Sequence, residues 1–198
     1  IMCGFLFLVH QNRTIDKNQF LKMGDLLKHR GPDNHNIWIS QDKKFGLAHQ
    51  RLSIIDLSEN GNQPMTSLNG RYTIAFNGEI YNHKEIRKKI NLSSDTFWIS
   101  NSDTETLLKS IEILGLHNTL KEINGMFAIC IYDALTSKVH LVRDRVGEKP
   151  LYYLIENNKI YFASELKALI CYKELPKKID IDSLDCYLTM GFVPGDAC

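Results

Sequence analysis

A cysteine near the beginning of the sequence has the chemistry of a catalytic nucleophile. Cys3 follows Met2, which can serve as a translational start. If Met2 is removed, Cys3 carries both a thiol and a free α-amine. The amine titrates at about 7.7 to 8.0 and the thiol at about 8.5, so the amine can accept the thiol proton near neutrality and later return it. Such a residue can catalyse acyl transfer without a histidine. The plainer alternative is that residues 2–4 only begin a strand.

Three charged side chains further along the sequence are candidates for binding an amino acid. Arg51 lies in a stretch otherwise suited to a buried strand, where its guanidinium needs an anion. That anion is either a structural carboxylate of the chain or the carboxylate of a ligand, which the planar guanidinium binds through two hydrogen bonds. Asp103 opens a helix, where the helix dipole alone would explain a negative charge. Glu79 follows an Asn-Gly pair and has a plain alternative as a solvated turn residue.

The Asn-Gly pair itself is a candidate for stabilising an oxyanion. Asn77-Gly78 between strands usually forms a hairpin turn. Here the strand is expected to end at Phe76, and Asn82 with Glu85 forms the capping pattern of a helix. The pair is therefore expected at a strand-to-helix junction, where the side-chain amide and the Gly78 N–H group are free to bind a developing oxyanion.

Together these residues predict a receptor for glutamine, whose side-chain carbonyl Cys3 would attack. The predicted roles are Arg51 for the α-carboxylate, Asp103 and Glu79 for the α-ammonium group, and Asn77 with Gly78 for the oxyanion.

The elements that must position this receptor mix strands and helices without strict β-α-β alternation. This favours an α+β fold with antiparallel sheets covered by helices. The last four predicted strands are joined by short turns and are expected to form an antiparallel meander. We expect strands at 3–9, 36–40, 45–55, 72–76, 126–132, 139–143, 151–154 and 159–163, and helices at 16–30, from 82, at 102–115, 165–172 and 183–188.

The composition excludes several classes of function. Lys and Arg number 24 against 23 Asp and Glu, so no general attraction to nucleic acid or anionic membranes is expected. The apolar run at 3–9 is too short for a membrane span or a signal peptide, which favours a cytoplasmic protein. The five scattered cysteines lack a Cys-x-x-Cys pair, and the histidines lack metal-ligand spacing. No glycine-rich phosphate loop is present, so we expect neither a metal nor ATP in this domain.

Nine sequence blocks resemble, in order and spacing, the N-terminal glutaminase domain of glutamine-hydrolysing asparagine synthetases, a class II glutamine amidotransferase. The resemblance covers essentially the whole chain. The His-Gln-Arg-Leu-Ser-Ile and Asn-Gly-Glu-Ile-Tyr-Asn blocks favour this branch over the sugar-phosphate and purine amidotransferases. The blocks lie at 2–4, 30–33, 46–56, 63–65, 77–82, 102–105, 124–128, 143–153 and 163–169.

The resemblance implies the N-terminal-nucleophile hydrolase fold, a four-layer α/β/β/α sandwich of antiparallel sheets. It implies one domain over residues 1–198, with a core at about 3–180 and the start of a connection to a C-terminal synthetase domain at 181–198. Backbone groups near Leu52 and Ile54 would assist in binding glutamine, and Arg30 would support the terminus. ATP and Mg²⁺ would bind only in the synthetase domain, and a homodimer remains open.

Two rival functions also remain open at this point. One is an N-terminal-nucleophile amidohydrolase acting on a different amide. The other is a non-catalytic regulatory or docking domain that retains the fold. Because Ile1 and Met2 precede Cys3 in the sequence, we expect a chain that starts at Ile1 to be nearly inactive and one that starts at Cys3 to be active.

Overall fold

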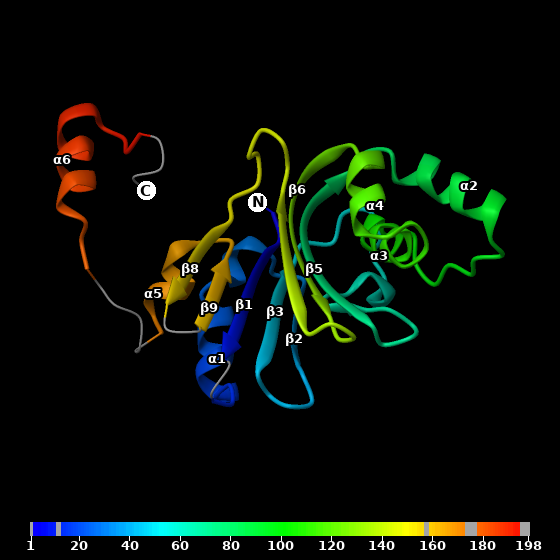
Figure 1. The fold of residues 1–198 in the computed structure, drawn as a ribbon, viewed down its shortest axis with the longest axis horizontal. Coiled ribbons are helices and arrows are strands. Elements are labelled where there is room, and N and C mark those ends of the chain that lie inside the picture. Colours follow the sequence, from blue (N-terminus) through cyan, green and yellow to red (C-terminus); the bar gives the residue numbers. More distant parts are fainter. Residues whose placement is uncertain (1, 11–12, 157–158, 173–177, 195–198) are drawn as a thin grey trace.

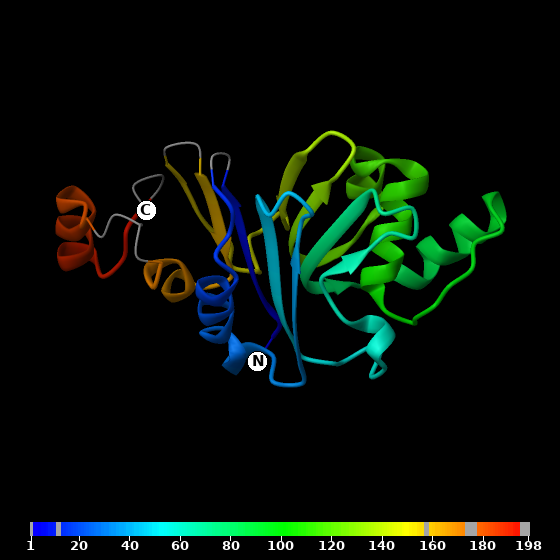
Figure 2. The ribbon, with the colours of Figure 1, turned by 90° about the horizontal axis from the view of Figure 1, so that it is seen from below.

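Two antiparallel sheets pack face to face, and helices cover both outer faces of the pair (Figures 1 and 2). The computed structural model describes residues 2–10, 13–156, 159–172 and 178–194. The five-stranded sheet has the order β2-β3-β1-β9-β8, and the four-stranded sheet has the order β4-β5-β6-β7. The strands are β1 (Gly4–His10), β2 (Asn34–Ile39), β3 (Phe45–Arg51), β4 (Met65–Thr66), β5 (Tyr72–Ile80), β6 (Gly125–Asp133), β7 (Lys138–Arg143), β8 (Tyr152–Glu156) and β9 (Lys159–Ala163).

The helices form the two outer layers of the sandwich. Helices α1 (Lys17–Asp25) and α5 (Leu166–Ile170) cover the five-stranded sheet. Helices α2 (His83–Ser93), α3 (Asp103–Leu114) and α4 (Leu116–Glu122) cover the four-stranded sheet. Helix α6 (Ile181–Met190) lies near the end of the chain, and short 3₁₀ turns occupy Lys28–Arg30 and Glu59–Gly61. The four layers agree with the predicted α/β/β/α sandwich.

Strand β1 explains how this core is arranged. Its side chains alternate between the helix-covered face, with Leu6 and Leu8, and the layer between the sheets, with Phe5 and Phe7. All seven residues of β1 are buried. A strand with two buried faces needs an unbroken apolar run rather than an alternating one, which is the pattern at 3–9.

The helices expected at 16–30 and 102–115 both begin at a residue whose side chain accepts a capping hydrogen bond. The Asp16 carboxylate accepts hydrogen bonds from the N–H groups of Asn18 and Gln19, and α1 follows it. The Ser102 hydroxyl accepts one from Glu105 N–H at the start of α3. The predicted cap at Asn82 is different: its side chain bonds to the backbone around residues 122–124 and makes no cap hydrogen bond.

The structure corrects three predictions about strands. The strand expected at 45–55 ends at Arg51, so residues 52–55 lie outside it. The strand expected to end at Phe76 continues to Ile80, so Asn77 and Gly78 lie inside β5, opposite Ala128 and Phe127 of β6, and not at a strand-to-helix junction. The last four strands do not form one meander, because β6 and β7 pair in one sheet while β8 and β9 pair in the other. Hydrophobic alternation identifies a strand but carries no information about which sheet it joins.

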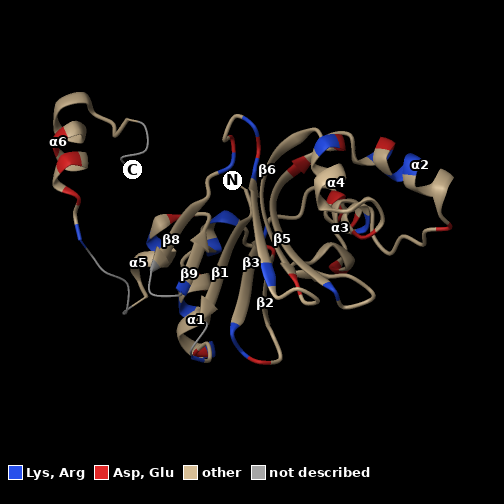
Figure 3. Cartoon of the chain, in the orientation of Figure 1, with Lys and Arg blue, Asp and Glu red and all other residues tan. Residues whose placement is uncertain are grey.

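Charges of both signs are spread over most of the molecule, whereas α6 carries only acidic residues. Figure 3 shows Lys and Arg mixed with Asp and Glu on the helices and loops, while the strands are mostly uncharged. Among the residues that the structure describes, no helix has the length and apolar character needed to cross a membrane.

Candidate active site

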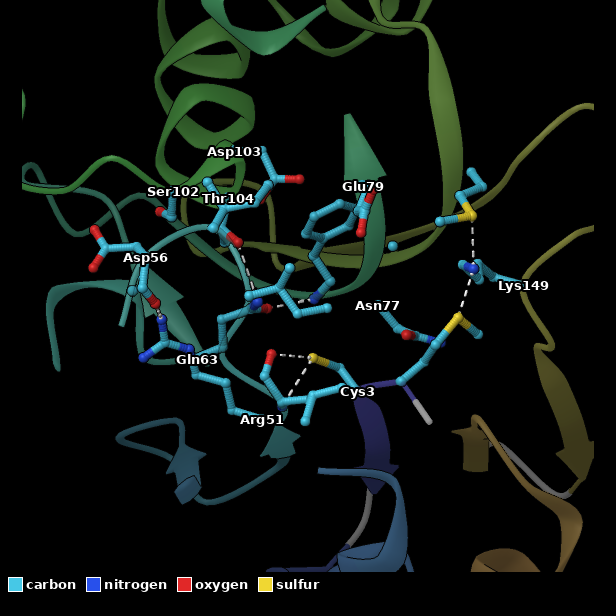
Figure 4. A pocket seen from close by; sticks show the side chains of 18 residues that line it. Cys3, Arg51, Asp56, Gln63, Asn77, Glu79, Ser102, Asp103, Thr104 and Lys149 are labelled. Atoms are coloured by element: carbon cyan, nitrogen blue, oxygen red, sulfur yellow. Dashed lines mark hydrogen bonds between the residues drawn. The ribbon is translucent and has the colours of Figure 1, made fainter. Parts of the chain in front are cut away.

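The Cys3 thiol lies directly before β1, at one end of the layer between the sheets (Figure 4). Its Sγ atom accepts a hydrogen bond from Leu52 N–H at 3.3 Å and lies 3.5 Å from Leu52 O. Burial raises the pKa of this thiol, although the Leu52 N–H group and the nearby Arg51 guanidinium partly oppose the shift. The thiol is therefore protonated at neutral pH and needs a base before it can attack.

Arg30 fixes the backbone of Cys3. Its Nε donates to Cys3 O at 3.0 Å, and its Nη1 forms an ion pair with Glu165 Oε1 at 2.9 Å. Burial opposes ionisation of Glu165, but hydrogen bonds from Arg30, His29 and Lys167 lower its pKa to about 2. Glu165 is thus a carboxylate at any working pH and holds the Arg30 guanidinium against the start of β1.

The edge of β5 is open where it faces the pocket. Strand β4 pairs with β5 only at residues 73 and 74, so the following edge has no neighbouring strand. Side chains bind that edge instead: Phe76 N–H donates to Gln63 Oε1 at 2.6 Å, and Ile80 N–H donates to Asp103 Oδ2 at 2.9 Å. Gly78 lies between them and, by the alternation of a strand, directs its N–H group to the same edge.

The neighbouring strand does not use this Gly78 N–H group. Its partner Phe127 bonds away from β5, with its N–H donating to Asp144 Oδ2 and its C=O accepting from Asp144 N–H. A side chain at position 78 would collide with the carbonyl oxygen of Met126. Only glycine therefore fits this close approach of two strands, and its N–H group remains available at the pocket.

Asn77 supplies a second candidate donor. It is fully buried, and neither its Nδ2 nor its Oδ1 has a hydrogen-bond partner in the part of the chain that the structure describes. An unpaired buried amide costs roughly 1–3 kcal/mol. Asn77 also lines the pocket that contains Cys3, so a ligand is the natural partner of its amide (Figure 4). The half-buried Glu79 follows two residues later on the same face of β5 and also lines the pocket.

Arg51, the last residue of β3, is buried without a carboxylate partner. Its guanidinium donates to Ser58 O at 2.7 Å, to Asn62 Oδ1 at 2.8 Å and to Asp56 O. Within the described ranges no carboxylate oxygen lies within ion-pair distance of it. Among these residues Arg51 therefore has no direct ion pair, although its charge attracts the nearby Asp56 carboxylate and helps to lower the pKa of that group.

Asp103, the first residue of α3, contributes a buried negative charge. It is 5% exposed, and no described cation lies within ion-pair distance of it. Burial raises its pKa to about 6, against hydrogen bonds from Ile80 and neighbouring backbone, and the nearby Glu79 adds to the increase. A cationic ligand group would therefore stabilise Asp103 in its ionised form.

The pocket contains residues that the sequence reasoning did not assign. Gln63 belongs to the block at 63–65 and was given no role, yet its side chain lies against β5. Lys149 is buried, and its Nζ atom lies 2.6 Å from Met2 Sδ and 2.8 Å from Met126 Sδ. A lysine between Glu and Pro in a polar turn shows no sign of burial in the sequence. Leu52 and Ile54, whose backbone groups were predicted to assist in binding glutamine, both line the pocket. Leu52 contacts Cys3 through its backbone, whereas Ile54 is 59% exposed.

Metal ligation has no structural basis in the described residues. They contain no group of three or more His, Cys, Asp or Glu side chains placed to hold a metal ion.

The two antiparallel sheets between helical layers have the N-terminal-nucleophile hydrolase fold, which is the fold of glutamine amidotransferases. The Bacillus subtilis glutamine phosphoribosylpyrophosphate amidotransferase has this fold: it aligns with a TM-score of 0.72 at 20% identity, over 85% of this chain and 43% of that one. A solved allosteric regulatory enzyme of purine biosynthesis aligns with a TM-score of 0.67 at 18% identity, again over 85% of this chain and 43% of its own. At these identities the likeness concerns the fold.

The chain belongs to the glutamine amidotransferase domain family, whose sequence profile matches residues 2–198. Asparagine synthetase (glutamine-hydrolyzing) 1 of Bacillus subtilis is 37% identical over 98% of this chain and 30% of the relative. Its paralogue 2 is 39% identical over 90% of this chain and 24% of the relative. A Methanocaldococcus jannaschii relative, provisionally named in the same way, is 39% identical over 98% of this chain and 40% of its own length. The chain thus spans less than half of these relatives and is similar to their glutaminase domain.

Proposed function

We propose that this domain hydrolyses glutamine to glutamate and ammonia with Cys3 as nucleophile. The observation that carries the proposal is the buried, unpaired amide of Asn77, which lines the same pocket as the Cys3 thiol and the open Gly78 N–H group. Arg51 at the same pocket suits the α-carboxylate of an amino acid, and Asp103 with Glu79 suits its α-ammonium group. An α-amino acid with a side-chain amide matches all of these groups.

In the first step of the proposed mechanism, the Cys3 sulfur attacks the side-chain carbonyl carbon of glutamine. The free α-amine of Cys3 takes the thiol proton, which it must do because the thiol pKa is raised. The carbonyl π electrons move to oxygen, and the resulting oxyanion accepts hydrogen bonds from Asn77 Nδ2 and Gly78 N–H. The α-ammonium group then protonates the amide nitrogen, the C–N bond breaks, and ammonia leaves a glutamyl thioester on Cys3.

In the second step, water attacks the thioester carbonyl carbon. The α-amine takes a proton from the water, and the oxyanion again rests on Asn77 and Gly78. The C–S bond breaks, the thiolate recovers the proton, and glutamate is released. No metal or cofactor takes part in either step of this proposal.

This chemistry requires removal of Met2 for two reasons. Besides blocking the amine, its side chain lines the pocket and its sulfur contacts Lys149. Removing Met2 therefore both frees the base and empties space beside Cys3.

The test measures glutamate release from glutamine by chains of defined N-terminus, each verified by mass spectrometry. We expect turnover from a chain that begins at Cys3 and turnover at the background rate from its Cys3→Ala variant and from a chain that keeps Met2. Cys186→Ala, which alters a cysteine on α6, is the matched control and should retain full activity. Native turnover in Cys3→Ala would refute the proposal, and faster turnover of an unrelated amide than of glutamine would indicate a different amidohydrolase.

For the full-length protein we propose that the ammonia passes to an ATP- and Mg²⁺-dependent C-terminal synthetase domain that amidates aspartate in the cytoplasm. The names of the relatives and their greater length support this proposal. Asparagine formation by the full-length protein from glutamine, aspartate and MgATP would test the acceptor. Failure with aspartate, together with continued glutamine hydrolysis, would point to another acceptor.

A further inference from the structure

Phe76, the residue before Asn77, has both of its backbone polar groups bound by side chains from distant elements. Its N–H group donates to Gln63 Oε1 at 2.6 Å, and its C=O group accepts from His49 Nε2 at 3.1 Å. Both partners are deeply buried, with exposures of 0% for His49 and 4% for Gln63. Because β4 has already ended here, the two side chains take the place of a neighbouring strand.

His49 makes its contact from the opposite sheet. It lies on β3, and its ring spans the layer between the sheets to reach β5. A carbonyl oxygen can only accept, so Nε2 carries the hydrogen in this contact. Burial, with a smaller contribution from Arg51, lowers the pKa of His49 to about 4, although the bond to Phe76 O opposes the shift. The ring is therefore neutral at working pH and is held in a single tautomer, with Nδ1 unprotonated.

Gln63 connects the same point of β5 to the beginning of α3. Its Nε2 donates to Thr104 Oγ1 at 3.1 Å, and the residue before Thr104 is Asp103, which binds Ile80 N–H. The edge of β5 is thus held at Phe76 and at Ile80, on either side of Gly78. The only N–H group between these two attachments on this edge is the one that faces the pocket.

We propose that His49 and Gln63 are positioning residues that preset the oxyanion hole. The inference rests on the proposed glutaminase function. The Phe76 carbonyl and the Asn77 N–H group belong to one planar peptide, so fixing the carbonyl fixes the direction in which residue 77 leaves the strand. Donors held in place before the reaction stabilise the oxyanion without reorganisation, whereas loosened donors lose part of that stabilisation.

The test separates binding of the amino-acid part of glutamine from stabilisation of the oxyanion. Norvaline carries the α-carboxylate and α-ammonium groups but no side-chain carbonyl. The glutamine analogue with an aldehyde in place of the amide adds the Cys3 thiol and places an oxygen in the hole. For His49→Phe and Gln63→Leu we expect kcat and the affinity for the aldehyde to fall together, by about tenfold or more. This is smaller than the loss expected when an oxyanion-hole donor is removed altogether. Norvaline affinity should stay within about twofold, because Arg51 and Asp103 are untouched.

Two further variants serve as controls. Gln50→Leu alters the neighbouring residue of β3, which is equally buried but points to the other face and donates to Gly24 O. It should lower stability while leaving the ratio of aldehyde to norvaline affinity unchanged. His49→Gln supplies an amide donor in place of the imidazole and should recover part of the loss in kcat.

The outcomes are distinguishable. An unchanged aldehyde affinity in folded Gln63→Leu would overturn the inference, as would an equal loss of aldehyde and norvaline affinity in Gln63→Leu or His49→Gln. If His49→Phe does not fold, these two variants and Gln50→Leu still decide the question. A wild-type chain starting at Cys3 that neither hydrolyses glutamine nor binds the aldehyde would instead refute the proposed function.

Discussion

At the scale of single residues, the pocket is marked by buried polar groups that the described part of the protein leaves unpaired. Asn77 has no hydrogen-bond partner, Arg51 has no carboxylate at ion-pair distance, and Asp103 has no cation at that distance. Each of these groups costs stability in the empty pocket and gains a partner when an amino acid binds. The site is therefore identified by missing interactions rather than by the contacts it makes.

Asp103 allows this cost to be measured. Its pKa rises from 3.8 to about 6 on folding, so the folded state favours the protonated form. The carboxyl group then lowers stability progressively as pH rises from about 4 to 6, and the loss is constant above that. Asp103→Asn removes the charge and keeps an acceptor for Ile80 N–H, so at pH 7 we expect the free chain to gain up to about 3 kcal/mol. Urea unfolding between pH 4 and 7 measures this, with Asp185→Asn on α6 as the control. An unchanged stability difference across this range would contradict the prediction.

The same group predicts how glutamine binding depends on pH. The proposed contact to the α-ammonium group requires ionised Asp103. The KM for glutamine should therefore rise as pH falls below about 6, and this rise should be absent in Asp103→Asn, which has a high KM throughout. Steady-state kinetics of glutamate release between pH 5 and 8 test this. A wild-type profile parallel to that of Asp103→Asn would exclude Asp103 as the titrating group.

At the scale of elements, one carboxylate organises the loop between β7 and β8 beside the pocket. Asp144 Oδ1 accepts from the N–H groups of Val146 and Glu148, and Oδ2 accepts from those of Phe127 and Lys149. Burial opposes ionisation, but these four donors hold the pKa of Asp144 below its usual value. The loop thereby places Lys149 in the pocket and holds Phe127, near the beginning of β6, opposite Gly78.

Asp144→Asn tests this role. The amide keeps one acceptor but directs an NH₂ group at two backbone donors, so we expect a loss of about 2–4 kcal/mol in the free energy of unfolding. The contribution of wild-type Asp144 is present above a pH of about 4 and is lost as pH falls through its lowered folded-state pKa. Chemical denaturation measures both effects, with the exposed Asp95→Asn as the control. Equal stabilities of the two variants at neutral pH would refute the role.

At the scale of the whole molecule, three apolar clusters account for the four layers, and α6 belongs to none of them. One cluster lies between the sheets and one lies under each helical layer. Helix α6 has no buried residue, and Ile181, Tyr187 and Leu188 are more than half exposed. In Figure 1 it stands apart from the sandwich. The predicted connection at 181–198 remains a prediction.

Hydrogen exchange should separate α6 from the sandwich. Helix α3 is buried along most of its length, whereas the amides of α6 are protected only by local hydrogen bonds. We therefore expect the amides of residues 184–190 to exchange far faster than those of α3 in the isolated chain, by a factor of about a hundred or more. Mass spectrometry after deuterium labelling measures the difference. Protection of α6 equal to that of α3 would show that its exposed face is covered in solution.

Much of the fold could be predicted from local patterns. The apolar run of β1 and the capping residues Asp16 and Ser102 correctly identified elements, because periodicity and capping depend on neighbours in the chain. The meander was predicted wrongly, and β5 was predicted to be shorter than it is. Both errors have the same cause. Sheet membership and the length of a strand depend on partners far away in sequence, such as the pairing of Gly78 with Phe127.

The sequence by itself determined which residue types were available: a cysteine that can become a terminus, a lone arginine in an apolar strand, an Asn-Gly pair and an acid at a helix start. Only the tertiary structure decided what surrounds them. Among the residues that it describes, it left Arg51 without a carboxylate at ion-pair distance and the Asn77 amide without a partner, and it bound the edge of β5 through His49 and Gln63. Burial and hydrogen-bond pairing depend on how distant segments of the chain pack together. In this site, the polar groups that packing leaves without partners distinguish the pocket from an ordinary protein core.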